Sequence, residues 1–512
     1  MERTKSQARF TEGLPPSRQD SDEQRTDEKG IGEHVETPAP KLDKHGFPLL
    51  PQPSDNKDDP LNWSPMLKLA VVLQVSWLAF LGPMAAAVAN PAFVVIGRAF
   101  EITPVQASYS LTMYICFAGV GPLLIIPFAN HYGRRPVYLV ANLVAAATNI
   151  AASYSTTWSG LLATRAFNGI FGGTPPAIGA ATVCDLYFMH ERGFYTGIFT
   201  FFLTNGPHVA PLMGGFLAQY MGWEWCYRIP GFIQLGTFVV TLFCLPETLY
   251  SRSTSSVTHK PHSYWELITF RATLPQRRLK LKDFWRNIYM LKYLTVTIPG
   301  AYYMTSFAWG SIIFAATGSQ LFREFYGFTT SQTGLMLSIP LLIGCLIGEA
   351  NAGWLIDWMV VRYAKKHDGV KLPEARLDAL WFGLFVPIGL IIEGVCLSHH
   401  KTVHWVGSAF GMGIANLGLQ AATTVTYAYT TDCYKPQSAE ISSLLNLFRS
   451  TFGMIVSFYA IPLGEEIGFQ YAWLIFALIN IALFVPFMAL KWVGPKLREK
   501  PWQSPPTFNR DL

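Results

Sequence analysis

The stretch Gly121–Tyr138, GPLLIIPFANHYGRRPVY, decides how the rest of the chain is interpreted. It ends one long apolar run, turns at a Gly-Arg-Arg-Pro signal and begins the next apolar run, as two membrane helices joined by a cationic turn would. A related stretch, GWLIDWMVVR at 353–362, returns 227 positions later and aligns Asp357 with Asn130. The repeated turn predicts a chain built from two related halves.

Composition indicates a membrane protein. Half of the 512 residues are hydrophobic and only 14% are charged, against about a quarter in ordinary soluble domains. Apolar runs long enough to cross ~30 Å of hydrocarbon as helices recur along nearly the whole chain, which argues against a soluble enzyme. The seven cysteines are scattered without a CxxC pattern, so we expect no metal site. The net charge of +6 lies in loops and tails, and we expect no nucleic-acid partner.

Six apolar spans on either side of a polar linker give the domain organisation. We expect a disordered tail at 1–64, a six-helix bundle at 65–247, a cytosolic linker at 248–292, a second six-helix bundle at 293–493 and a short tail at 494–512. The predicted spans are 67–90, 105–128, 136–155, 158–184, 193–217 and 227–247, then 293–317, 333–357, 379–398, 403–428, 440–463 and 470–493.

The loop charges predict the orientation. With the tails and the linker left out, loops after even-numbered spans hold nine Lys or Arg, and loops after odd-numbered spans hold three. Because cationic loops stay in the cytosol, both termini should be cytosolic. No apolar segment follows Met1 that would serve as a cleaved signal peptide. We expect the plasma membrane, and the vacuolar membrane remains open.

Three motifs resemble those of the major facilitator superfamily. HYGRRP at 131–136 resembles the second half of its Gly-x-x-x-Asp-Arg-x-Gly-Arg-Arg turn, although Asn130 replaces the Asp. RAFNG at 165–169 resembles its Arg-x-x-Gln-Gly pattern in span 4. Span 5 resembles the Gly-Pro-x-x-Gly-Gly antiporter motif but has two extra residues. The matching positions are Gly206, Pro207, Pro211, Gly214 and Gly215.

Further features are similar to fungal members of the drug:proton antiporter branch: DPLNW at 59–63, VCDLYF at 183–188, LPET at 245–248 and PEARL at 373–377. The resemblance covers about 60–495. It implies an all-α fold of twelve transmembrane helices in two pseudo-symmetric six-helix bundles. It also implies proton-coupled export by alternating access, with the proton gradient as energy source, no cofactor, a small-molecule substrate, and the lipid bilayer as surroundings for a monomer.

Charged residues at bilayer depth cost at least ~2.5–3.5 kcal/mol on insertion scales and mark candidate sites. Arg165 is interpreted as a fixed cation that faces the cavity and tunes proton or substrate release; a structural arginine bonded to carbonyl groups is the alternative. Glu349 and Glu393 are candidate proton carriers, and each could instead pair between helices or sit near a helix end. His208, between two prolines, is either a proton carrier or a hydrogen-bonded structural histidine.

The remaining candidates fall into three groups. In span 11, Arg449 and Asn446 share a helical face at i and i+3. The resemblance implies a cavity wall from spans 1, 2, 4, 5, 7, 8, 10 and 11, although core packing is the alternative for each aromatic. The wall candidates are Tyr109, Asn168, Asn205, Tyr302, Tyr303, Trp309, Asn416, Gln420 and Tyr427. We expect two ion pairs, Asp185–Arg192 and Asp357–Arg362, to act in a conformational gate. The gate candidates are Asn130, Gly133, Arg134, Arg135, Asp185, Arg192, Asp357 and Arg362.

Three functions are compatible with this pattern. The first is a proton-coupled exporter of a toxin, drug or secondary metabolite. The second is an importer of a nutrient or polyamine cation, and the third is a non-transporting membrane receptor. The chain has no GxxxxGK[ST], HExxH or GxSxG motif, so ATP-driven transport and hydrolase chemistry are unsupported.

Overall fold

A computed structural model describes residues 52–188, 191–250, 266, 281–366, 373–434, 437–503 and 506. At 192–193, 351–358, 360–361 and 363–366 it describes the backbone alone. Most of the predicted tail at 1–64, of the linker at 248–292 and of the final residues therefore lies outside the described part, and those boundaries stay predictions. The described residues form helices joined by short turns and contain no strand.

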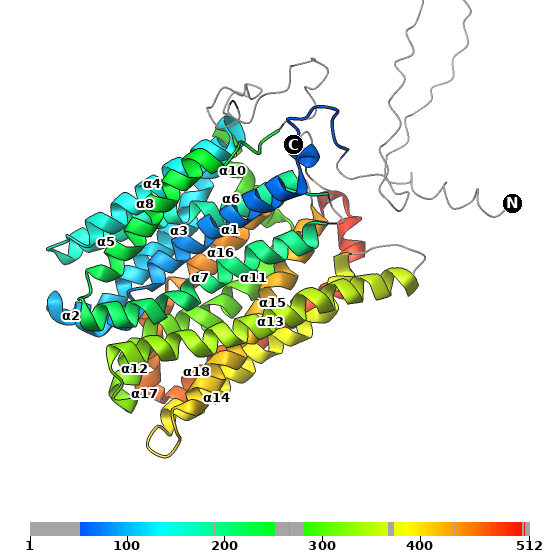
Figure 1. Cartoon of the computed structure of the whole chain (residues 1–512). Coiled ribbons are helices and arrows are strands. Elements are labelled where there is room, and N and C mark those ends of the chain that lie inside the picture. Colours follow the sequence, from blue (N-terminus) through cyan, green and yellow to red (C-terminus); the bar gives the residue numbers. More distant parts are fainter. Residues whose placement is uncertain are drawn as a thin grey trace, which may run out of the picture.

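The first bundle holds six spans, of which the first and fourth are each built from two α-helices (Figure 1). In chain order the elements are η1 (Pro60–Asn62), α1 (Pro65–Ala87), η2 (Asn90–Ala92), α2 (Phe93–Ala99), α3 (Pro104–Tyr132), α4 (Arg134–Ala152), α5 (Trp158–Gly172), α6 (Thr174–Leu186), α7 (Arg192–Tyr220) and α8 (Trp225–Cys244).

The second bundle repeats six spans after a short linker helix, α10. The elements are α10 (Leu281–Tyr289), η3 (Met290–Lys292), α11 (Leu294–Phe307), the π-turn η4 (Ala308–Ile312), α12 (Ile313–Tyr326), α13 (Thr330–Lys366), η5 (Pro373–Leu384), α14 (Phe385–Ser398), α15 (Val406–Cys433), α16 (Ser438–Gly453), α17 (Val456–Ile467), α18 (Phe469–Arg498) and η7 (Pro501–Gln503). The predicted all-α membrane fold with two six-helix bundles is confirmed.

Sequence signals at the helix starts explain several boundaries. The Ser64 side chain accepts the Leu67 N–H, and Pro65 follows it as the first helical residue. At α3, Thr103 and Gln106 form a capping box in which each side chain binds the other's backbone N–H. These contacts satisfy donors that the first helical turn leaves free.

The two halves differ at the repeated turn. Gly133 has φ 104°, a conformation that favours glycine, and it separates α3 from α4. The equivalent position in the second half is Val360, and α13 continues without interruption to Lys366. Span 8 was expected to end at 357 with a turn after it. That expectation is wrong, because Asp357 and Arg362 lie inside a helix that has Val360 where the first half has the turn residue Gly133.

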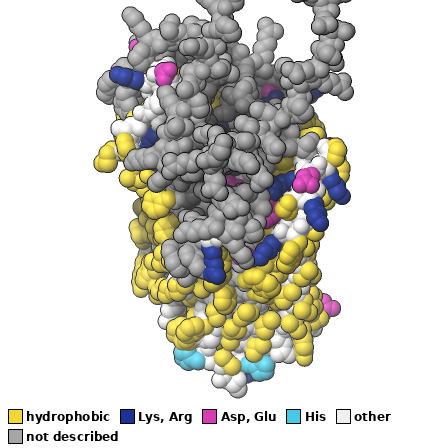
Figure 2. All heavy atoms as spheres, turned by 90° about the vertical axis from the view of Figure 1, so that its right-hand side faces the viewer, with side chains coloured by type: hydrophobic (Ala, Val, Ile, Leu, Met, Phe, Trp, Pro, Cys, Tyr) yellow, Lys and Arg dark blue, Asp and Glu magenta, His cyan; other side chains and the backbone are white. Residues whose placement is uncertain are grey.

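The flanks of the bundle suit a bilayer. Seven of the described helical stretches are long and apolar enough to cross a membrane. Large apolar side chains such as Val140, Phe243, Ile343 and Phe410 are exposed on the outer helices. Figure 2 shows hydrophobic side chains covering much of one flank, with Lys and Arg nearer one end and His at the other. Such an exposed apolar belt is what lipid contact requires.

Both described chain ends pack at the same end of the bundle, which we call the tail end (Figure 1). Ser54 Oγ lies 3.2 Å from Tyr250 Oη, just beyond α8. In the second bundle, the buried Gln503 side chain binds the Leu294 N–H at 3.1 Å and the Lys292 carbonyl at 3.0 Å. Each tail therefore fastens to its own bundle.

Candidate functional site

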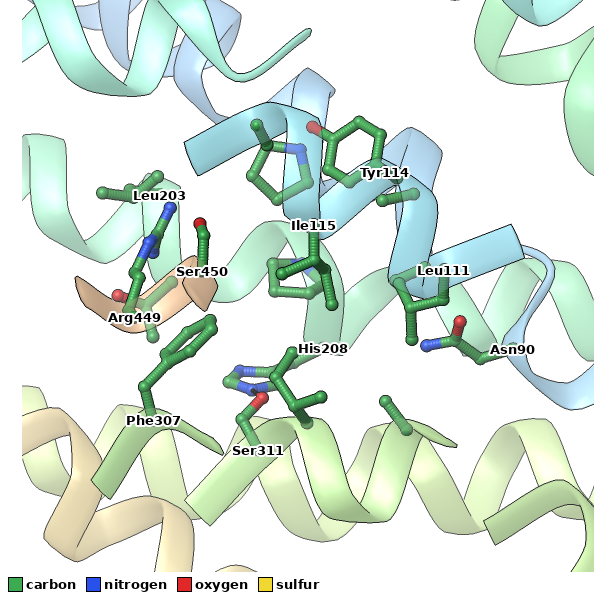
Figure 3. Close-up of a pocket in the computed structure, with 18 of the residues that line it drawn as sticks. Asn90, Leu111, Tyr114, Ile115, Leu203, His208, Phe307, Ser311, Arg449 and Ser450 are labelled. Carbon is green, nitrogen blue, oxygen red and sulfur yellow. Dashed lines mark hydrogen bonds between the residues drawn. The ribbon is translucent and has the colours of Figure 1, made fainter. Parts of the chain in front are cut away.

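A cavity lies between the two bundles and is lined by residues of both (Figure 3). Its walls come from α1, η2, α3, α6, α7, α11, η4, α12, α13, α15 and α16. These elements belong to spans 1, 2, 4, 5, 7, 8, 10 and 11, the eight that the resemblance implied. Most of the lining is apolar, as it is in sites for organic ligands.

Several polar atoms on the wall have no protein partner among the described residues. His208 Nε2 lies 3.3 Å from Ser311 Oγ, while its Nδ1 has no hydrogen bond. The Tyr114 hydroxyl and both amide atoms of Asn90 are also buried and unpartnered. Because leaving such groups unpaired costs about 1–3 kcal/mol each, a bound ligand or water would stabilise them.

Arg449 lines the cavity from α16 and is held in place by its neighbours. Its Nε donates to Asn446 Oδ1 at 2.8 Å, and Asn446 Nδ2 donates across the bundle interface to the Ala118 carbonyl at 2.8 Å. The Arg449 Cζ lies 4.9 Å from the centroid of the Phe307 ring, in cation–π geometry. The predicted shared face of Asn446 and Arg449 is therefore present.

Arg165 lies one layer behind the wall. Its guanidinium sits between the rings of Tyr114 and Tyr227, 5.3 and 5.2 Å from their centroids. It donates to Asn149 Oδ1 at 2.8 Å and to the Ala85 carbonyl at 3.4 Å. Asn168 binds the Ala145 carbonyl at 2.9 Å in the same layer. The carbonyl contact that the alternative reading required is present, and Tyr114 connects Arg165 to the cavity.

The two carboxylate candidates occupy different places. Glu349 accepts hydrogen bonds from Gln420 and, at 3.2 Å, from the Thr424 hydroxyl. A Cβ placed on Gly197 of α7 would lie 3.5 Å from Glu349 Oε1, so Glu349 lies at the seam between the bundles. Glu393 is 2% exposed on α14, which contributes no residue to the cavity.

Most of the remaining wall candidates lie outside the cavity. Tyr302 packs on Phe484 and Phe487, and Trp309 donates to Tyr459 Oη at 2.8 Å, both toward α17 and α18. The others lie behind the lining or bind backbone: Tyr427 contacts the Tyr303 ring, Tyr109 contacts Phe458, Asn205 binds the Phe201 carbonyl and Asn416 binds the Leu341 carbonyl. Tyr303 itself lines the cavity.

The gate candidates of the first bundle gather at its tail end. Arg134 donates to Asn130 Oδ1 at 2.7 Å and lies 3.4 Å from Asp185 Oδ2. Arg135 donates to the Leu242 carbonyl at 2.8 Å. These contacts join α3, α4, α6 and α8 within one bundle. The side chains of Arg192 and Asp357 lie outside the described ones, so both expected gate pairs stay predictions.

Glu247, in the LPET segment, completes this cluster. Its carboxylate accepts the N–H groups of Arg134 and Arg135 at 2.9 and 3.1 Å, and so caps the start of α4. It also accepts those of Thr248 and Leu249 at 2.9 and 2.8 Å. Burial raises the pKa of Glu247, and these hydrogen bonds oppose the shift.

We expect Glu247→Gln to lower thermal stability in detergent by about 1–2 kcal/mol, because an amide oxygen replaces a charged cap on four N–H donors. Thermal unfolding of the purified protein measures the change. Glu465→Gln, at an exposed glutamate on α17, is the matched control and should leave the midpoint unchanged. Equal midpoints for the two variants would show that Glu247 does not hold α4.

The antiporter-like motif packs α7 tightly against both bundles. A Cβ on Gly206 would lie 2.5 Å from the Phe80 carbonyl oxygen, and one on Gly214 would lie 1.7 Å from that of Val88, both on the α1–η2 segment. One on Gly215 would lie 2.8 Å from the carbonyl oxygen of Thr330, the first residue of α13. Pro207 and Pro211 line the cavity between these contacts. The spacing therefore lets one helix touch both bundles.

Sequence reasoning missed Asn90, Tyr114, Phe307 and Ser311, all of which line the cavity. Tyr114 stands in a span whose neighbours are mostly small or aliphatic, and Asn90 precedes Pro91 where α1 ends. Polar residues at such positions were a usable signal. Ser311 lies inside the π-turn η4, a local feature that often marks functional sites but has no sequence signature here.

Comparisons with known proteins agree with this architecture. A family model described as Major Facilitator Superfamily matches residues 75–366, more than half of the chain. An efflux pump, radE, from Floropilus chiversii is 27% identical over 87% of this chain and 84% of its own length. The MFS transporter cpaT from Aspergillus oryzae is 26% identical over 92% and 95%.

Among solved structures, a bacterial homologue of the human lysosomal transporter Spinster superposes with a TM-score of 0.57. It was crystallised in an inward-facing, unoccupied conformation. At 15% identity the match covers 86% of this chain and 100% of that one, and it shows the shared fold alone.

Proposed function

The chain belongs to the Major Facilitator Superfamily, and from that premise we propose that it is a proton-coupled secondary transporter that exports a small organic molecule by alternating access. One observation carries the proposal: a mostly apolar cavity lies between two six-helix bundles and draws its wall from both. A ligand bound there would contact both bundles at once, so that its binding energy would differ between their arrangements.

The export direction is supported by two observations. The glycines of α7 that resemble an antiporter motif bring this helix close to the backbone of the α1–η2 segment and of α13. A relative that matches 87% of this chain is named an efflux pump. With the tail end in the cytosol, as the loop charges predict, substrate would enter from the cytosolic side. The proposal further takes the protein to be a monomer of the plasma membrane.

His208 is the proton carrier in this proposal. It lines the cavity, and its Nδ1 has no partner among the described residues, so a proton can bind there without breaking a protein contact. Substrate in the cavity would lie beside this ring, so that binding of the substrate and binding of the proton would influence each other. Glu349 is the second candidate, since it lies at the seam beside Gln420 and Thr424.

We expect His208→Gln to lower transport driven by a pH gradient at least about tenfold, because glutamine keeps the Ser311 contact but binds no proton. Substrate exchange at equal pH should stay within about twofold of wild type, since it needs no net proton transfer. Proteoliposomes loaded with substrate measure both rates. If Glu349→Gln shows this uncoupled behaviour and His208→Gln does not, the proton is carried by Glu349.

The function itself is tested by accumulation. Cells with and without the chain are given a panel of fluorescent drugs and labelled polyamines, with and without a protonophore. Lower retention of an organic compound, cancelled by the protonophore, supports proton-coupled export. A gain of polyamine would instead favour the importer. The importer finds less support in the cavity, because its described lining residues include no Asp or Glu that would hold a polycation.

A further inference from the structure

The charges around the cavity have one sign. Among the described residues that line it, Arg449 is a permanent cation and none is an Asp or Glu. None of the described carboxylates forms an ion pair with Arg449 or with Arg165 behind Tyr114. The protein therefore holds two cations beside this cavity, the buried Arg165 and the partly exposed Arg449, without counter-charges among the residues described. Amide, carbonyl and aromatic groups compensate a cation less completely than an opposite charge does, and an anion in the cavity would supply that charge.

Arg449 is positioned to receive such an anion. The contact of its Nε with Asn446 fixes the direction of the guanidinium plane, and the Phe307 ring supports its face. Arginine held in this way binds carboxylate, sulfonate or phosphate oxygens with little loss of freedom. Figure 3 shows Arg449 at one end of the cavity, beside Ser450 and Phe307.

The rest of the cavity suits an uncharged body. Leu111 and Ile115 supply apolar surface between Arg449 and the opposite end, where Asn90 is found, and Leu203 adds apolar surface at the Arg449 end (Figure 3). The unpartnered atoms of Asn90, Tyr114 and His208 offer hydrogen bonds to neutral polar groups. A ligand that matched this wall would be apolar along its length, with its charge concentrated at the Arg449 end.

We propose that the substrate is an amphipathic organic anion, with one acidic group bound by Arg449 and an apolar skeleton lying across the cavity toward Asn90. This inference rests on the proposed function in taking the cavity as the substrate site. Such anions come from two sources, which are soluble aromatic or alicyclic acids and single-chain lipid acids, and the same chemistry would recognise both.

Two probes with the same skeleton test the proposal. The anion 1-anilinonaphthalene-8-sulfonate and the neutral N-phenyl-1-naphthylamine differ by the sulfonate alone, and both fluoresce in apolar surroundings. Binding is measured to the full chain in phosphatidylcholine nanodiscs, with empty nanodiscs subtracted. We expect Arg449→Gln to raise the Kd of the anion at least about tenfold and that of the neutral probe less than about twofold. Arg449→Lys should fall between wild type and Arg449→Gln for the anion.

The controls separate charge recognition from misfolding. Arg98→Gln removes an exposed arginine of α2 and changes the net charge equally, and it should bind both probes like wild type. Neutral-probe binding reports an intact cavity in every variant. Equal weakening of both probes by Arg449→Gln, or no saturable binding of the anion to wild type, would overturn the proposal.

Competition distinguishes the two sources. Displacement of the anionic probe by 2-naphthoate but not by laurate would favour soluble acids, and the reverse would favour lipid acids; either result supports the anion. Displacement by the cation tetraphenylphosphonium and by neither acid would contradict it. All measurements are made at equilibrium without a gradient. If the protein binds the anion more tightly than the neutral probe but transports nothing, the proposed exporter function is refuted and the anion inference stands. If it transports substrate but binds both probes equally, only the anion inference is refuted.

Discussion

Arg165→Ala is expected to abolish transport driven by a pH gradient, with a loss of at least about 100-fold in initial rate. The guanidinium holds Tyr114 and Tyr227 on its two faces and ties α5 to Asn149 of α4 and to the Ala85 carbonyl of α1. Without it, the Tyr114 ring loses its support on the cavity wall, and a positive charge disappears from behind it. Both the shape and the field of the site change together.

The same substitution also lowers stability. It leaves the Asn149 oxygen without its donor and opens a gap between two aromatic rings, at a cost of about 2–4 kcal/mol. Rates are therefore compared per amount of monodisperse, membrane-inserted protein. The protein should remain inserted, because the span becomes more apolar.

Two variants decide what the loss means. Arg165→Lys keeps the charge but cannot stack between both rings while binding both acceptors, so we expect it to recover only part of the rate. Arg228→Ala removes another arginine that packs on aromatic rings, those of Tyr154 and Trp225, at the end of the same bundle. It should transport within about twofold of wild type. A wild-type initial rate for folded Arg165→Ala would remove Arg165 from the mechanism.

The sequence predicts the helices better than it predicts the site. Long apolar runs and the polar, Gly or Pro residues that separate them are local properties of the sequence. The spans and the two bundles could therefore be predicted from the sequence alone. Which helix faces meet is not local. Arg165 was expected to face the cavity, but Tyr114 stands between them, and Tyr302 and Trp309 turn toward α17 and α18 instead. The helical period of 3.6 residues shows which side chains share one face of a helix, but it does not show which other helix packs against that face.

The contacts around Arg134 and Arg135 at the tail end also could be predicted only in part from the sequence. The Gly-Arg-Arg-Pro signal correctly marked the turn between α3 and α4, because positive φ at Gly133 is a local requirement. The residue that caps α4 is Glu247, more than a hundred positions away, and only the packing of α8 beside α4 brings it there. The second half kept the apolar pattern of the motif but lost the glycine, so the alignment with Asp357 suggested a turn where the helix continues.

Gly214→Ala is expected to reduce transport at least about tenfold and to lower thermal stability by about 1–3 kcal/mol. The new Cβ would lie 1.7 Å from the Val88 carbonyl oxygen, and this obstacle is backbone, which cannot rotate away as a side chain can. The α1–η2 segment and α7 must therefore move apart. Asn90 lies two residues beyond Val88, so the separation would carry a cavity residue with it. Initial transport rates and thermal unfolding measure both effects.

Gly236→Ala is the matched control, because a Cβ on this α8 glycine would meet nothing within 4 Å. It should transport normally and gain a little stability, since alanine favours a helix over glycine. If Gly214→Ala behaved like Gly236→Ala, the contact between α1 and α7 would be loose enough to absorb a methyl group. The antiporter-like spacing would then no longer support the proposed direction of transport. Loss at Gly214 alone would instead show that this close approach is what the glycines of α7 provide.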